Sequence, residues 1–125
     1  LWHVDENFYE LYGKKGLKLN QKYLDELKVL LDKKNIRLTI INYPWPGTIY
    51  RYKGISYYEQ FWQDWSINND VEYLNIVKKF DFVKNLNFEK RIGHIKKYFI
   101  YNDMHFNKTG SELIFNEMIP LLNKK

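Results

Sequence analysis

Asp103 and His105 stand two residues apart, shortly before an apolar-periodic helix at the end of the chain. A neutral imidazole can take the proton of a weak hydroxyl nucleophile. A carboxylate bonded to its other nitrogen fixes the tautomer and stabilises the imidazolium. Because residues i and i+2 of an extended segment project to the same side, the two side chains can lie together. The spacing predicts a general base and its orienting carboxylate.

Two other interpretations of this pair remain open. Asp103 can simply begin a turn that leaves His105 on the surface, because short motifs often arise by chance. The pair can also contribute to a divalent-metal site, which would need at least one more ligand from elsewhere. No Cys is present, and no other His is close to the pair in sequence.

The residues that follow the pair suit a support for it. Asn107 can cap the final helix, which would steady the loop that carries His105. Gly110 would permit close backbone packing near the site. Residues 98–101 are expected to form a short strand that brings Asp103 and His105 to the edge of a sheet. We therefore regard Asn107 and Gly110 as supporting site residues.

This block of Asp103, His105, Asn107 and Gly110, with the amphipathic helix 111–123 behind it, resembles the last conserved block of the SGNH hydrolases, the GDSL-like esterase superfamily. In that family the Asp and His of this block complete a Ser-His-Asp triad. The resemblance implies that His105 is the general base and Asp103 its orienting carboxylate. It implies a carboxylic ester hydrolase or O-acyltransferase that acts on an acylated small molecule or saccharide, without a metal or organic cofactor.

The family's nucleophilic Ser lies in a Gly-Asp-Ser-like block, and no such block occurs in this chain. We therefore expect the chain to be a single domain, 1–125, that forms the C-terminal portion of an SGNH-type domain. The nucleophile and most oxyanion donors would come from the missing N-terminal part, with that part or a dimer mate as partner. The alternative is a non-catalytic SGNH-like domain that binds a glycan or a protein.

The three serines of the chain are predicted to be structural. Ser56 and Glu59 have the spacing of a capping box, in which each side chain bonds the other's backbone N–H. Ser66 has no candidate base beside it in sequence, and Ser111 should be solvated in the first turn of the last helix. None of them is nominated as the nucleophile.

The elements expected upstream are those of an α/β domain. Buried strands are expected to alternate with amphipathic helices, and this order is typical of a parallel sheet. With the resemblance, it predicts a flavodoxin-like, three-layer parallel sheet flanked by helices and incomplete at its N-terminal side. The expected elements are helix 20–34, capped by Asn20 after a loop at 13–16; strand 37–43; helix 56–68; strand 71–76; and a short helix at 89–97.

Trp45 lies in a Pro-rich loop, 44–47, directly after the first predicted strand. Proline cannot continue a central strand, so the loop should sit at the strand's carboxyl end. Ligands of open α/β sheets bind at that edge. Trp45 is therefore expected either to wall a substrate pocket or to plug the core beneath the loop.

Composition bounds the remaining classes of function. The chain has 20 basic and 15 acidic residues, 45% hydrophobic residues and no Cys, which argues against disorder and against a disulfide or thiolate-zinc framework. Its lysine doublets are scattered and accompany no nucleic-acid-binding motif, so no nucleic-acid partner is expected. No apolar run is long enough to span a membrane, and either a cytoplasmic or a cell-envelope location is compatible. His3 and His94 are interpreted as ordinary surface residues.

Overall fold

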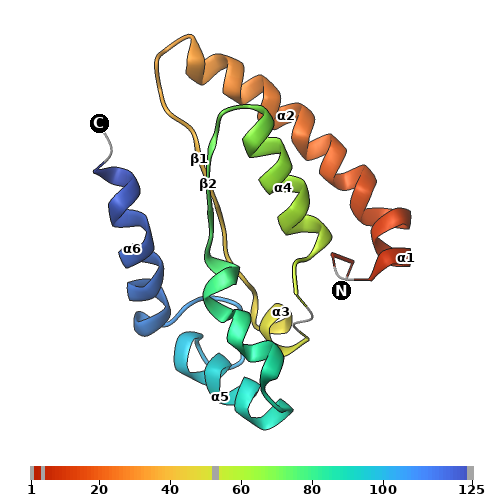
Figure 1. Cartoon of the computed structure of the whole chain (residues 1–125), viewed down its shortest axis with the longest axis vertical. Coiled ribbons are helices and arrows are strands. Elements are labelled where there is room, and N and C mark those ends of the chain that lie inside the picture. Colours follow the sequence, from red (N-terminus) through yellow and green to blue (C-terminus); the bar gives the residue numbers. More distant parts are fainter. Residues whose placement is uncertain (1, 4, 52–53, 124–125) are drawn as a thin grey trace. The chain divides into compact units, whose positions relative to one another are not determined.

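The computed structural model describes residues 2–3, 5–51 and 54–123 and is 67% helical. In chain order the elements are α1 (Glu6–Phe8), a π-helical turn (Tyr9–Gly13), α2 (Lys14–Asp32), β1 (Thr39–Asn42), α3 (Pro46–Tyr50), α4 (Tyr57–Asn68), β2 (Glu72–Asn75), a 3-10 helix (Ile76–Asn85), α5 (Phe88–Tyr98) and α6 (Lys108–Leu122) (Figure 1).

β1 and β2 lie side by side as a two-stranded parallel sheet, and no third strand joins them within the described residues (Figure 1). The predicted α/β class is thus present in a loose sense, as a small parallel sheet among helices. Both predicted strands form, but each is shorter than expected. The expected strand at 98–101 is reduced to a single antiparallel bridge between Phe99 and Phe106. The sheet observed is smaller than a three-layer flavodoxin-like arrangement requires.

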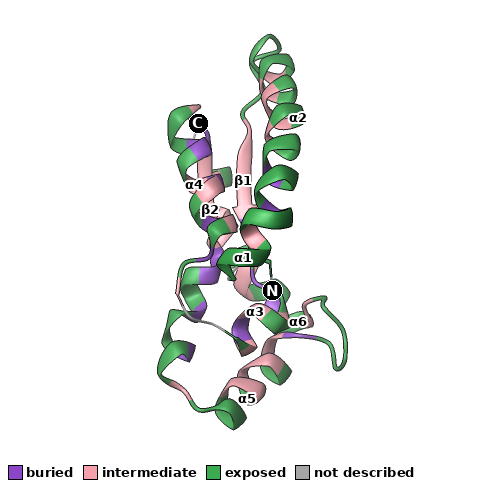
Figure 2. Cartoon of the chain, turned by 90° about the vertical axis from the view of Figure 1, so that its right-hand side faces the viewer, coloured by how far each residue is buried: buried purple, intermediate pink, exposed green. Residues whose placement is uncertain are grey.

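The first of two compact units comprises the described residues of 1–40 and 55–73. Its buried core consists of Leu17 from α2, Trp62 and Trp65 from α4, and Val71. The indole Nε1 of Trp65 donates a hydrogen bond to Asp25 Oδ1 at 2.7 Å, which joins α4 to α2. Figure 2 shows that much of α2 is exposed whereas β1 is half-buried. Two of these four buried residues are therefore aromatic residues of the predicted helix 56–68.

The second unit comprises the described residues of 41–54 and 74–125. In this unit α5 packs against α3 and α6. The Arg91 guanidinium donates hydrogen bonds to the carbonyl oxygens of Leu86, Tyr50 and Lys84, at 3.0–3.2 Å, which fixes α5 to the end of α3 and to the end of the 3-10 helix. The buried core is formed by Ile49, Ile76, Val77, Phe80, Val83 and Phe99.

The expected loop at 13–16 and the Asn20 cap are wrong, because helical backbone runs through both. The π-helical turn leads directly into α2, which begins at Lys14. A Cβ atom at Gly13 would collide with the Trp2 ring, so this glycine is required for packing rather than for a turn. The Lys14 ammonium also pairs with Glu10 at 3.0 Å across the junction. Tertiary packing and an i,i+4 ion pair thus outweigh the helix-breaking tendency of glycine.

The capping box predicted at the start of α4 is confirmed. Ser56 Oγ accepts a hydrogen bond from the Glu59 N–H at 3.2 Å, and Glu59 Oε2 accepts one from the Ser56 N–H at 3.0 Å. Both side chains are buried. Ser56 is therefore committed to the helix start.

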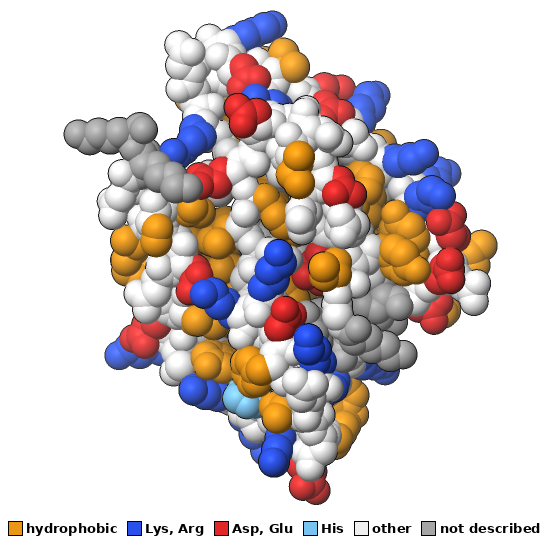
Figure 3. Space-filling model, in the orientation of Figure 1, with side chains coloured by type: hydrophobic (Ala, Val, Ile, Leu, Met, Phe, Trp, Pro, Cys, Tyr) orange, Lys and Arg blue, Asp and Glu red, His pale blue; other side chains and the backbone are white. Residues whose placement is uncertain are grey.

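The charged side chains of the described residues do not gather by sign on the face that Figure 3 shows. Lysine and arginine side chains are interspersed there with aspartate and glutamate. Among the described helices, none is both long enough and apolar enough to cross a bilayer.

Candidate active site

The candidate site lies on a tight loop between α5 and α6. Phe99 and Phe106 form a β-bridge and stack their rings at 4.5 Å, which closes the base of the loop. The Ile100 N–H donates to the His105 carbonyl at 3.0 Å, and the Asp103 N–H donates to the Ile100 carbonyl at 3.0 Å. Asn102 turns the chain at φ 58°, a conformation that Asn tolerates well. Backbone hydrogen bonds and the stacked Phe99 and Phe106 rings therefore define the conformation of the loop.

The side chains of Asp103 and His105 are hydrogen-bonded. His105 Nδ1 lies 2.6 Å from Asp103 Oδ1, and the same oxygen accepts the His105 backbone N–H at 3.1 Å. The backbone bond, followed by the bond to the ring, lowers the pKa of Asp103 below its ordinary value. The bond to a carboxylate favours the tautomer that carries its proton on Nδ1, which leaves Nε2 as an acceptor. The imidazole is 77% exposed, so Nε2 can be reached from outside the loop.

Asn107 holds the loop to both neighbouring helices. Its Oδ1 accepts the Gly110 N–H at 3.0 Å and so caps α6, as the sequence predicts. Its Nδ2 donates to the carbonyl oxygens of Lys97 and Phe99 at 3.0 and 3.2 Å. One amide side chain therefore joins the end of α5 to the start of α6.

Gly110 lies where no side chain fits. A Cβ atom there would overlap the Tyr98 carbonyl oxygen and the ring of Phe106. The first turn of α6 can therefore approach the end of α5 only because this residue is glycine, as the sequence suggests.

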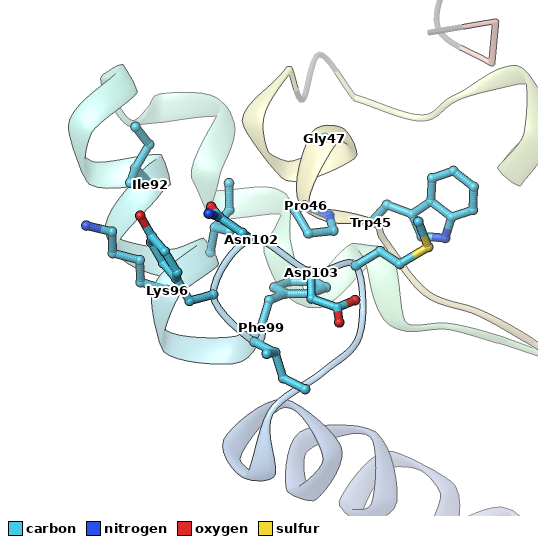
Figure 4. A pocket seen from close by; sticks show the side chains of 12 residues that line it. Trp45, Pro46, Gly47, Ile92, Lys96, Phe99, Asn102 and Asp103 are labelled. Carbon is cyan, nitrogen blue, oxygen red and sulfur yellow. The ribbon is translucent and has the colours of Figure 1, made fainter.

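A cavity of about 460 Å³ adjoins Asp103, whose partner His105 is not among the residues that line it. Trp45, Pro46 and Gly47 border it at the start of α3, Ile92 and Lys96 border it on α5, and the loop contributes Asn102 and Asp103 (Figure 4). Trp45 is 54% exposed, so it lines the cavity and does not plug the core.

Several residues of the cavity wall were not predicted from the sequence. Ile92 and Lys96 are one helical turn apart on α5, and this i,i+4 spacing is the signal that could have identified them as one face. Met104 also lines the cavity from between Asp103 and His105. Which face of α5 meets the loop depends on tertiary packing.

Scans against protein-family models, curated proteins and solved structures return no match to this chain.

Among the described residues, neither a serine nor a metal-binding cluster completes the Asp103–His105 pair. Within the described residues, no serine hydroxyl is hydrogen-bonded to the His105 ring. Ser66 is buried in α4, and Ser111 is exposed in the first turn of α6. No group of three or more His, Cys, Asp or Glu side chains suited to a metal ion occurs in the described part of the chain.

The other two histidines differ from their expected surface placement. His3 is half-buried, and desolvation lowers its pKa. His94 is half-buried in α5, with its ring edge-on to Phe82 at 4.7 Å and its Nδ1 atom buried without a hydrogen-bond partner. Neither is bonded to a carboxylate as His105 is.

The Asp103 carboxylate should control the order of the loop at low pH. Because its pKa is lowered in the folded loop, its hydrogen bonds contribute fully above about pH 3.9, the ordinary aspartate value. That contribution should be lost as the pH falls through the lower, folded-state pKa. NMR titration of the His105 amide should show this acid transition, and Asp103→Asn should abolish it. A midpoint at or above the ordinary value would contradict the assignment.

Proposed function

We propose that Asp103 and His105 are the orienting carboxylate and general base of an SGNH-type ester hydrolase or O-acyltransferase. The observation that carries this proposal is the 2.6 Å contact between His105 Nδ1 and Asp103 Oδ1. It leaves Nε2 as the free basic nitrogen on a ring that is 77% exposed. A carboxylate–imidazole pair of this kind activates a hydroxyl nucleophile.

In the proposed reaction, His105 Nε2 takes the proton of a serine hydroxyl as its oxygen attacks the ester carbonyl. The imidazolium then gives that proton to the departing alkoxide as the acyl–oxygen bond breaks. In the second half, Nε2 deprotonates water or a sugar hydroxyl, which attacks the acyl-serine, and the proton returns to the serine. Asp103 holds the ring orientation and stabilises its charged form throughout.

The serine in this scheme comes from outside the 125 residues, together with most oxyanion donors. The positions of the present serines support this assignment. Ser56 caps α4, Ser66 is buried, and Ser111 makes no hydrogen bond to the His105 ring. The nucleophile would come from the remaining part of the same domain, and that part or a dimer mate would be the partner of this chain.

A flavodoxin-like, three-layer fold of the complete domain is part of the same proposal. β1 and β2 are parallel and are connected through helices, which is the repeating unit of a parallel sheet. Each strand has a single partner among the described residues, so further strands can pair at either edge. A flavodoxin-like, three-layer sheet would result if the remaining part of the domain supplied those strands.

The cavity beside the pair suits an acylated small molecule or saccharide. Its wall is mainly apolar, with Trp45 and Met104 beside Asp103, so an acyl group can lie against it. Among the described residues of that wall, Lys96 is the one basic side chain. No metal or organic cofactor takes part in the proposed steps.

Fluorophosphonate labelling of the full-length protein that contains this sequence tests the proposal. The activated serine oxygen should displace fluoride from phosphorus and form a stable adduct. Peptide mass spectrometry should find the adduct on a serine outside this sequence. Labelling of Ser56, Ser66 or Ser111 would overturn the assignment of the nucleophile. Absence of any adduct would favour a non-catalytic domain that binds a glycan or a protein.

A further inference from the structure

A second cavity, of about 440 Å³, lies in the other compact unit and contains no residue of the Asp103–His105 site. It is formed where the π-helical turn and the first turns of α2 meet the start of α4. Three aromatic rings, two glycines, one leucine and one amide line it. These residues are Trp2, Tyr12, Gly13, Gly16, Leu17, Asn20 and Tyr58.

Gly16 has no steric reason to be glycine. It lies inside a 19-residue helix, where glycine is less favourable than alanine. A Cβ atom at this position would meet no other atom within 4 Å. The missing side chain leaves room in the cavity beside Tyr12 and Asn20, and a ligand could use that room.

The walls of the cavity are held in place by specific packing. Trp2 lies against Gly13, where a Cβ atom would collide with the indole, and it meets Tyr58 edge-to-face at 5.9 Å. Tyr12 and Gly13 belong to the π-helical turn. Such turns are rare in helices and occur frequently at functional sites. Close packing against Gly13 and a π-helical turn thus position two of the three rings.

The chemistry of the wall selects the kind of ligand. None of the described residues that line the cavity is charged, and Lys15 and Lys18 follow on the same helix, which disfavours a cation. Aromatic rings offer flat apolar surfaces, while tyrosine hydroxyls and the Asn20 amide can donate and accept hydrogen bonds. A neutral ring with an apolar face and a hydroxylated rim matches both properties.

We propose that this cavity binds a neutral saccharide ring, with one face of the sugar over Gly16 and against the aromatic side chains. The Asn20 amide bonds its hydroxyl groups. The site is independent of the proposed acyl transfer, so either can fail without the other.

NMR titration of the chain with cellotetraose and with maltotetraose tests this proposal. At least one of the two neutral glucans should shift the backbone amide signals of Gly16 and Asn20 in a saturable manner. Tetramethylammonium should leave them unchanged. Failure of both glucans to shift these signals would overturn the proposal. Shifts produced by tetramethylammonium alone would overturn it in favour of a cation-binding aromatic cage.

Two variants separate the cavity from general surface binding. In Gly16→Leu the new side chain leans toward the preceding turn, which carries Tyr12 and Gly13, and fills the cavity. Affinity for the bound glucan should fall at least tenfold while the helix is retained, because leucine favours helix more than glycine does. Gly93→Leu is the matched control, since Gly93 lies in α5 and is equally free of neighbours. Unchanged affinity in Gly16→Leu, or an equal loss in both variants, would overturn the proposal.

Discussion

Replacing His105 with alanine should lower ester turnover by the full-length protein by about 1,000-fold or more, because it removes the proposed general base. The protein should remain folded. The His105 side chain is 77% exposed, and substitutions at exposed positions usually change stability by only about 0.5 kcal/mol. Turnover of p-nitrophenyl acetate and the thermal unfolding midpoint, measured on the same samples, separate the two effects.

Asp103→Asn is the companion variant. It keeps the size of the side chain but removes the charge that stabilises the imidazolium, so turnover should fall by about 100-fold or more. Lys108→Ala, just beyond the loop, provides a neighbouring control, because this side chain is 91% exposed and does not line the cavity. Equal turnover in the parent and His105→Ala would remove His105 from the mechanism.

Replacing Gly110 with alanine should destabilise the second unit by about 2–3 kcal/mol, the usual effect of forcing extra atoms into a packed site. The added Cβ atom overlaps the Tyr98 carbonyl oxygen and the Phe106 ring, and backbone cannot move aside as a flexible side chain can. The first turn of α6 must therefore shift away from α5. The hydrogen bonds of Asn107 should lengthen with it.

Gly93→Ala is the control for that substitution, and its effect should have the opposite sign. Gly93 also lies in a helix, but a Cβ atom there meets nothing within 4 Å. Alanine should therefore stabilise α5 by about 0.5–1 kcal/mol through helix propensity. Urea unfolding of the two variants gives both values. A stability gain in Gly110→Ala would contradict the close approach of α6 to α5.

Local patterns in the sequence predicted the parts of the fold that depend on residues close together in the chain. Ser56 and Glu59 form their capping box, and Asn107 caps α6, because caps involve partners only three residues apart. The pairing of Asp103 with His105 is equally local.

Features that depend on distant residues were not predictable in the same way. The sequence predicts a loop at Gly13, whereas in the structure Gly13 is helical and packs against Trp2. The exposure of Trp45, and its place in one cavity wall with Lys96, follow from how α3 and α5 pack. The extent of the sheet depends on strand pairing, which the hydrophobicity of a single segment does not specify.

The loop from Phe99 to Phe106 is closed by its own backbone hydrogen bonds and stacked rings. These contacts therefore offset the conformational entropy lost in ordering Asp103 and His105 when the chain folds, before any substrate binds. In the proposed acyl transfer, a hydroxyl group that reaches Nε2 meets a base already oriented for proton transfer. The loop is then preorganised for that reaction, and the entropy of arranging it does not add to the activation barrier.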